Sequence, residues 1–204
     1  MNKLRFLIYF LFIGFIIGYL TLKEKNYSGY PAFTSSGYIN AIVEIPAGTN
    51  HKIEYKPYYN KFENDLNPDG TDRIIEFLPY PGNYGFIPST RLDHTVGGDN
   101  DPLDVLIISE TEAVKTVIEV IPVAIIYLQD SGQVDHKIIA IPAKQEKRII
   151  HSTNYQDFID DHPAIHRIIE LWFTSYKNQD QMKFLGWGDE KKAMQEISIW
   201  AEKE

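Results

Sequence analysis

Between Tyr38 and Pro142 the chain is built largely from short runs rich in valine and isoleucine, each bounded by glycine, proline, asparagine or aspartate. Runs of this kind favour β-strands, and the residues that bound them favour turns. The predicted strand runs are 38–46, 52–56, 73–80, 104–109, 114–130 and 136–142. Because they follow one another at short spacing, we expect a closed or partly closed β-barrel and not a sheet of alternating strands and helices.

Two helices are expected after the barrel. The first covers residues 162–179, where Pro163 suits a first turn and apolar residues recur at three- and four-residue spacing. The second begins after Gly188, where Asp189 can cap it, and it carries apolar residues on one side. The chain is therefore predicted to be α+β, mainly β, with two flanking C-terminal helices.

The first 22 residues have a different character from the rest. Residues 6–22 are uncharged and apolar and follow Lys3 and Arg5; as a helix they would extend roughly 25 Å, near the lower limit for crossing a bilayer. We divide the chain into a hydrophobic signal or anchor segment (1–22), a linker (23–37) and a domain (38–204). The weak positive bias of the start predicts a domain outside the cytoplasmic membrane, anchored or exported after cleavage. A cytoplasmic location is the alternative.

Composition restricts the partners and the chemistry. The 204 residues are 44% hydrophobic, which is enough for one well-packed domain. A net charge of −8 argues against a nucleic-acid partner, because no basic stripe is available to contact phosphates. The absence of cysteine excludes disulfides, cysteine-ligated zinc and a cysteine nucleophile. If the ligand is nevertheless an anion, metal ions must mediate its binding.

The sequence GGDNDPLDVLIIS, residues 97–109, places Asp99, Asp101 and Asp104 at the start of a predicted buried strand. Like charges at this range repel unless a cation neutralises them. Oxygen ligands of this kind suit Mg²⁺ or Ca²⁺. An EF-hand loop does not fit, because Asp104 occupies the position that needs glycine and strand-like sequence flanks the loop. Taken alone, the stretch is equally compatible with a solvated acidic turn.

A second acidic hairpin, QDSGQVDHK, contributes Asp130 and Asp135 on either side of Ser131 and Gly132, with Lys137 beyond them. By itself it is typical of an ordinary β-turn with charged shoulders. Joined to the first cluster across the mouth of a barrel, it would form a site for several metal ions.

The stretch DNDPLDVL (99–106) resembles the D-x-D-P-x-D-V-L signature of the soluble family I inorganic pyrophosphatases. Further stretches match in the family's order: VEIPA (43–47), KIEY (52–55), DR (72–73), YPGNYG (80–85), DSGQVDHK (130–137), YK (176–177) and GW (186–187). The resemblance covers about residue 38 to the C-terminus and leaves out the hydrophobic start. It implies a five-stranded OB-like barrel, a homo-oligomer, and Mg²⁺-dependent hydrolysis of pyrophosphate to two orthophosphates.

The resemblance also implies roles for individual residues. Asp99, Asp104 and Asp135 resemble ligands of the tightest divalent ions, Asp130 and Glu44 resemble carboxylates that hold the metals arriving with substrate, and Asp101 resembles the base that takes a proton from the attacking water. The groups that resemble phosphate ligands are Lys52, Arg73, Tyr84, Lys137, Tyr176 and Lys177, of which Arg73, Tyr84 and Lys137 are also counted with Asp101 in the catalytic set. Glu54, Tyr80 and Lys183 resemble supporting members of the same cavity.

A second hypothesis from another class is a non-catalytic barrel in which the same carboxylates hold a divalent ion for stability or partner contact. Such a module would need the aspartates but not Arg73, Lys137, Tyr176 and Lys177 together. Taken singly, each of these residues could also have a purely structural role, as a charge at a strand edge, a packed aromatic ring or a cation at a helix end. Their joint order favours the enzyme.

Overall fold

The computed structural model describes residues 26–177 and 181–202. The apolar segment 1–22, and with it the anchor prediction, lies outside these residues. None of the helices in the described part combines the length and hydropathy that crossing a membrane requires.

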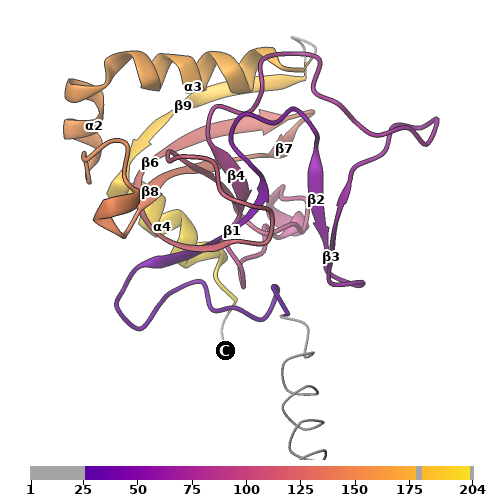
Figure 1. Ribbon diagram of the computed structural model, residues 1–204, viewed down its shortest axis with the longest axis horizontal. Helices are drawn as coiled ribbons and strands as arrows, with labels where there is room; N and C mark the ends of the chain where they lie inside the picture. Colours follow the sequence, from indigo (N-terminus) through magenta and orange to yellow (C-terminus); the bar gives the residue numbers. More distant parts are fainter. Residues whose placement is uncertain (1–25, 178–180, 203–204) are drawn as a thin grey trace, which may run out of the picture.

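Five strands close into a ring at the centre of the molecule (Figure 1). They are β1 (Ile39–Ile45), β4 (Asn83–Phe86), β5 (Asp104–Ile107), β8 (Lys137–Pro142) and β6 (Val117–Asp130). Each pairs with the next, and β6 returns to β1; all pairs are antiparallel except β5 with β8. This confirms the predicted mainly-β, OB-like barrel. The short β7 (Gln133–Val134) and the longer β9 (Met182–Asp189) extend the sheet along β6.

The length of β6 allows it to serve several partners. Its first residues pair with β1, its middle with β8 and its last with β9. The register with β8 shifts between Pro122 and Ala124. A bulge is where a proline without an N–H is tolerated inside a sheet, and it bends the strand. The bend lets one strand pass from one side of the ring to the other.

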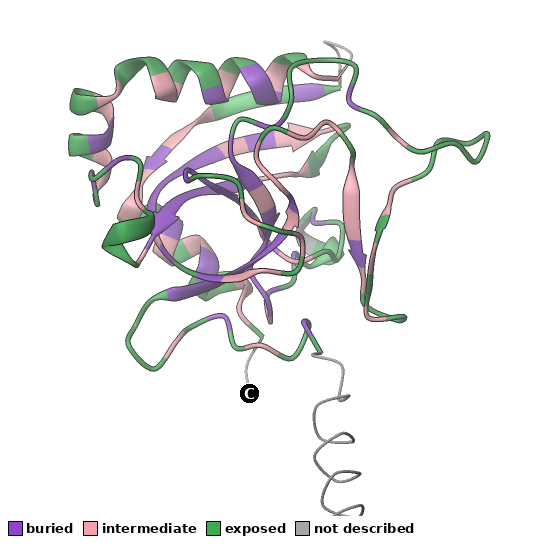
Figure 2. Ribbon diagram, viewed as in Figure 1, coloured by how far each residue is buried: buried purple, intermediate pink, exposed green. Residues whose placement is uncertain are grey.

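Alternate residues of the strands face two apolar clusters, as the two-residue period of a strand requires. On β8, Ile139 and Ile141 belong to the cluster under α2 (Tyr155–Asp161) and α3 (Pro163–Ser175). Ile138 and Ala140 belong to the cluster that α4 (Glu190–Trp200) covers. The ring therefore appears almost continuously buried in Figure 2.

Both predicted helices are confirmed. Pro163 is in the first turn of α3, and the side chain of Asp189 accepts a hydrogen bond from the Lys192 N–H at the start of α4. The structure adds the short α2, whose cap is Asn154, and two 3-10 turns, η1 (His94–Val96) and η2 (Gln145–Lys147).

The strand prediction was wrong in places. Residues 73–80 form no strand; Ile74 makes one isolated bridge to His51, and the carbonyls of Leu78 and Pro79 accept hydrogen bonds from the indole of Trp172. Conversely, the segment 83–86, which has the composition of a turn, is strand β4. Strands β3 (Lys61–Asn64), β7 and β9 were also not predicted.

A separate hairpin, β2 (Ile53–Lys56) with β3 (Lys61–Asn64), stands beside the barrel (right side of Figure 1). The described residues of the predicted linker, from Asn26 onward, contact this hairpin and the barrel. Tyr27 and Ala32 are buried, and the Asn40 N–H donates to the carbonyl of Ala32. The division of the chain at residue 38 stays a prediction.

Candidate active site

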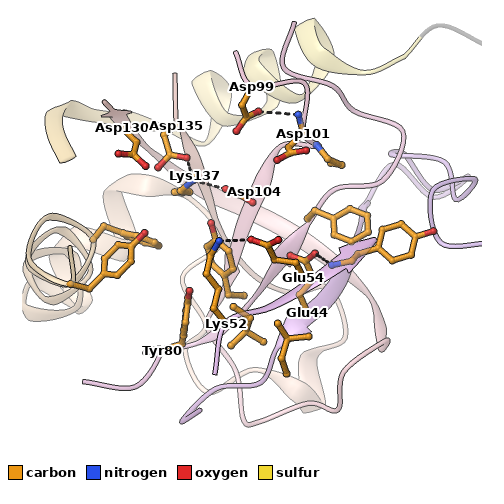
Figure 3. A pocket seen from close by; sticks show the side chains of 18 of the residues that line it. Glu44, Lys52, Glu54, Tyr80, Asp99, Asp101, Asp104, Asp130, Asp135 and Lys137 are labelled. Atoms are coloured by element: carbon orange, nitrogen blue, oxygen red, sulfur yellow. Dashed lines mark hydrogen bonds and ion pairs between the residues drawn. The ribbon is translucent and has the colours of Figure 1, made fainter. Parts of the chain in front are cut away.

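The predicted site residues surround one cavity of about 380 Å³ between the barrel mouth, strand β2 and the end of α3 (Figure 3). Eleven of the twelve predicted residues line it: Glu44, Lys52, Tyr84, Asp99, Asp101, Asp104, Asp130, Asp135, Lys137, Tyr176 and Lys177. Glu54 and Tyr80, predicted as supporting members, also line it. Segments that are far apart in the sequence thus meet where the motif order predicted.

The loop before β5 presents two of the aspartates. The N–H of Asp101 donates to Asp99 Oδ1 at 2.9 Å, and between them Asn100 has a φ of 70°. An asparagine tolerates this left-handed conformation better than most residues. Burial, together with the neighbouring charges of Asp99 and Asp104, raises the pKa of Asp101 to about 6. A carboxylate in this environment is a stronger base than an exposed aspartate.

Asp104 and Lys137 are brought together by the parallel pairing of β5 with β8, in which they are register partners. The ammonium of Lys137 forms an ion pair with Asp104 and lies 2.5 Å from Asp135 Oδ1. Burial alone would lower the pKa of Lys137, but the two carboxylates raise it above the usual range. Lys137 is therefore a buried cation held by two acids.

Glu44 occupies a β-bulge, since the register of β1 with β4 shifts between Val43 and Ile45. A bulge turns a side chain out of the regular alternation, and here the carboxylate lines the cavity. Its Oε1 accepts a 2.7 Å hydrogen bond from the Tyr55 N–H. Desolvation nevertheless raises the pKa of Glu44 to about 8. With no metal ion bound, Glu44 therefore holds a proton at neutral pH, even though Lys52 lines the same cavity.

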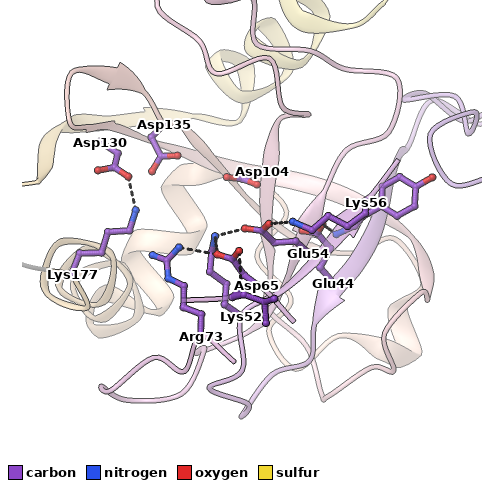
Figure 4. A network of polar contacts seen from close by, with 12 residues as sticks. Glu44, Lys52, Glu54, Lys56, Asp65, Arg73, Asp104, Asp130, Asp135 and Lys177 are labelled. Atoms are coloured by element: carbon purple, nitrogen blue, oxygen red, sulfur yellow. Dashed lines mark hydrogen bonds and ion pairs between the residues drawn. The ribbon is translucent and has the colours of Figure 1, made fainter. Parts of the chain in front are cut away.

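Strand β2 and the residue before it supply a cationic wall, formed by Lys52 and Lys56. Lys52 and Lys56 both bind the carboxylate of Glu54, the second at 2.6 Å (Figure 4). All three residues line the cavity. Lys56 was not among the predicted residues, although the two-residue period of a strand places it on the same face as Lys52 and Glu54.

Arg73 is the predicted residue that does not line the cavity. Its Nη1 donates to Asp65 Oδ2 at 2.9 Å, and the same oxygen is 3.5 Å from the Lys52 ammonium (Figure 4). Arg73 is thus held at the rim, beside the cationic wall. Asp65 was missed because it lies in a polar, turn-rich stretch without a recognisable pattern. Lys183, expected as a supporting member, is exposed on β9 and does not line the cavity.

The opposite side of the cavity carries tyrosines and a further ion pair. Lys177 binds Asp130 at 2.5 Å, and its ammonium lies 5.5 Å from the centre of the Tyr176 ring. Tyr84 lies below Lys137, and burial raises the pKa of its hydroxyl well above the usual value. Tyr84 therefore stays protonated and can donate a hydrogen bond.

The carboxylates provide the hard oxygen donors that Mg²⁺ prefers. Burial, and after it the repulsion between neighbouring carboxylates, raises the pKa of both Glu44 and Asp101. Within residues 26–177 and 181–202, however, no three histidine, cysteine or acidic side chains are already grouped closely enough to hold an ion. Lysines are bound to several of the acids instead. The residue types fit a divalent cation, and ligation by the named aspartates stays a prediction.

The structure is thus an OB-like barrel with carboxylates, lysines and tyrosines gathered around one cavity at its mouth. The family described as Inorganic pyrophosphatase matches residues 41–204. An inorganic pyrophosphatase of Synechocystis is 36% identical over 168 residues, which are 79% of this chain and 89% of the relative. The chain belongs to the inorganic pyrophosphatase family.

Solved structures agree with this assignment. The crystal structure of inorganic pyrophosphatase from Thermus thermophilus has a TM-score of 0.72 and 28% identity, covering 87% of this chain and 97% of that one. A truncated vacuolar soluble pyrophosphatase of Trypanosoma cruzi, solved in complex with PPi, has the same TM-score and identity. The match covers 85% of this chain and 71% of the Trypanosoma cruzi chain.

Proposed function

We propose that this chain hydrolyses inorganic pyrophosphate to two orthophosphates with the help of Mg²⁺. The observation that carries the proposal is the assembly of eleven motif residues around one cavity, in a chain of the inorganic pyrophosphatase family. A related structure solved with PPi supports the choice of substrate.

Glu44, Asp99, Asp104, Asp130 and Asp135 would hold the metal. When bound, Mg²⁺ supplies positive charge against the pyrophosphate oxygens and lowers the pKa of water at the site. The lysines now paired with these acids would then be released toward the substrate. This exchange explains how an acidic cavity can accept a multiply charged anion.

Asp101 is the proposed general base. Its carboxylate is at the cavity, and among the described residues no lysine or arginine is hydrogen-bonded to it. A base left free of a tight ion pair can accept a proton from the attacking water. Partial burial, and after it the charges of Asp99 and Asp104, raises the pKa of Asp101 above that of an isolated aspartate.

The phosphate groups require donors on both sides of the bond that breaks. Lys52 and Arg73 lie on the β2 side, and Lys177, Tyr176 and Tyr84 lie on the α3 side. Arg73 can bind a phosphate with two parallel hydrogen bonds, whereas lysine and tyrosine donate singly. Donors fixed in place before the reaction stabilise charge that develops on the departing phosphate.

The direct test is phosphate release from pyrophosphate by the purified full chain in mild detergent. We expect turnover with Mg²⁺ and none with EDTA. Ca²⁺ should suppress the reaction, because its larger size and looser geometry orient water poorly. Tight metal binding without phosphate release would instead support the non-catalytic barrel.

We further propose that residues 6–22 tether the domain to a membrane, with the domain outside the cytoplasm, and that the domain forms a homo-oligomer. Support for the tether comes from the uncharged apolar stretch alone. Cell fractionation should find the full-length protein with membranes, and external protease should digest a C-terminal tag. A shortened chain in the soluble exported fraction would indicate cleavage, and an uncleaved chain in the cytosol would refute the tether.

A further inference from the structure

We infer that the tip of the β2–β3 hairpin is a surface that docks on a phospholipid bilayer containing anionic headgroups. This inference rests on the proposed membrane tether. The tip is the turn Pro57–Asn60, closed by hydrogen bonds from the Tyr59 N–H to the Lys56 carbonyl and from the Asn60 N–H to the Pro57 carbonyl.

The tip presents two aromatic side chains to solvent. Tyr58 is 91% exposed and Tyr59 65% exposed, and their ring centres are 4.9 Å apart in an edge-to-face arrangement. Adjacent tyrosines are costly to leave in water and are not needed by the turn, which proline and asparagine already favour. Tyrosine is enriched at membrane interfaces, where its ring contacts the lipid and its hydroxyl contacts water.

The tip is fixed to the part of the chain that leads to the apolar stretch. The Tyr27 N–H donates to Asn60 Oδ1 at 3.5 Å, and the Tyr27 ring packs edge-on against Phe62 at 5.0 Å. We call these contacts the clamp. Tyr55 strengthens it, because the Tyr55 hydroxyl lies 3.0 Å from both Ser28 Oγ and Asn60 Oδ1. Tyr27 is only 9% exposed and Tyr55 is 8% exposed, so the two rings at the centre of the clamp are buried.

The clamp limits the distance between the apolar stretch and the hairpin tip. Leu22 and Tyr27 are five residues apart, so their Cα atoms can be separated by no more than about 19 Å. Tyr58 lies two residues from Asn60, which contacts Tyr27. If residues 6–22 enter a bilayer, the hairpin tip is therefore held near the headgroups of that bilayer.

The local charge suits anionic lipid although the whole chain is acidic. Lys61 is exposed at the base of the turn, and Lys115 reaches over the Phe62 ring at 5.9 Å. The connecting sequence Lys23-Glu24-Lys25 adds one net positive charge, and the acid nearest the turn on β3 is Glu63. Lysines near an anionic surface are attracted individually, whereas charges beyond about 10 Å are screened. The cavity acid nearest the turn on β2, Glu54, is already paired with the ammonium of Lys56 at 2.6 Å.

The absence of cysteine permits a single-site test. Tyr58→Cys and the control Glu146→Cys, which is exposed on η2, each receive a nitroxide label in the full chain. The proteins are reconstituted into vesicles of phosphatidylcholine and phosphatidylglycerol and floated on a density gradient. Collisions of each label with molecular oxygen and with a water-soluble nickel complex are then measured by electron paramagnetic resonance.

Docking predicts that the label at 58 collides with nickel at least threefold less than the label at 146, while its collisions with oxygen rise, since oxygen concentrates in lipid. Equal nickel collisions at both positions in floated protein overturn the docking but leave the tether. A fall in both nickel and oxygen collisions indicates a covering protein copy and also overturns it. Protein that does not float refutes the tether together with the docking, while its phosphate release from pyrophosphate reports the catalytic proposal separately.

Discussion

The ammonium of Lys137 lies between the carboxylates of Asp104 and Asp135 and is bound to both. Its side chain is only 4% exposed. The pairing follows from the fold, because β5 and β8 are parallel neighbours with Asp104 opposite Lys137. The same cation that would bind phosphate therefore neutralises two predicted metal ligands when no other cation is present.

Lys137→Met, which keeps an unbranched side chain one atom shorter and removes the charge, should destabilise the metal-free protein. Removing one partner of a fully buried ion pair costs about 3 to 5 kcal/mol, and the loss here should be somewhat smaller, because the side chains of Asp104 and Asp135 are 29% and 18% exposed. Urea unfolding in EDTA should show this loss, and Mg²⁺ should recover part of it by binding the two acids. The exposed pair of Lys147 with Glu112 offers the control. Lys147→Met should change stability by less than about 1 kcal/mol, and equal effects of the two variants would contradict the prediction.

Glu44 should make the stability of the metal-free protein depend on pH. Burial raises its pKa in the folded chain from 4.5 to about 8, so folding takes up a proton between these values. The free energy of unfolding should therefore fall as the pH rises from 4.5 to about 8. At about 1.4 kcal/mol per pH unit, the loss is at most about 5 kcal/mol.

Comparing the wild-type protein with Glu44→Gln isolates this contribution from those of other titrating groups. The amide oxygen can still accept the Tyr55 N–H but does not ionise. In EDTA, the variant should gain stability relative to wild type between pH 5 and pH 8.5, measured by urea unfolding. Curves that stay parallel would show that Glu44 ionises normally.

The barrel could be predicted because its strands are dominated by β-branched residues that are buried on both faces. Strand β4 could not, because its residues are typical of a turn and become a strand only by pairing with β1 and β5. The prediction for residues 73–80 failed in the opposite way. Ile74 and Ile75 suggest a strand, yet the main chain near Pro79 is held by a side chain of α3.

The sequence predicted which residues gather at the site, but not which ion pairs they form there. Motif order brought the aspartates, lysines and tyrosines to one cavity, because these positions are fixed by the fold. The partner of each lysine depends on side-chain rotamers and on the register between strands, which no motif contains. Asp65 gave no signal for the same reason: its importance comes from its position between Lys52 and Arg73.

Gly85 should be required for the barrel to close. A Cβ at this position would lie 1.8 Å from the carbonyl oxygen of Ile42 in the neighbouring strand β1. Backbone cannot move aside as a flexible side chain can, so Gly85→Ala should lower the thermal unfolding temperature strongly or prevent soluble expression. Gly29→Ala is the control, since its nearest atom is Asn26 Nδ2 at 3.4 Å. Similar unfolding temperatures of the two variants would refute the close approach.

Asp101→Asn should separate catalysis from folding. The residue is exposed to the cavity and forms no ion pair among the described residues, so the stability of the variant should stay within about 0.5 kcal/mol of wild type. Loss of a general base should lower kcat by about 100-fold or more, with a smaller change in KM.

The pH profile gives a second test of the same role. In the wild type, kcat should fall as the pH is lowered, because Asp101 takes up a proton. Its pKa is about 6 without cations, and bound cations move this limb to lower pH. The residual activity of Asp101→Asn should lack the limb. Glu146→Gln, an exposed acid on η2, should leave both kcat and the pH profile unchanged. A kcat for Asp101→Asn within threefold of wild type, measured by phosphate release at saturating Mg²⁺, would remove Asp101 from the role of base.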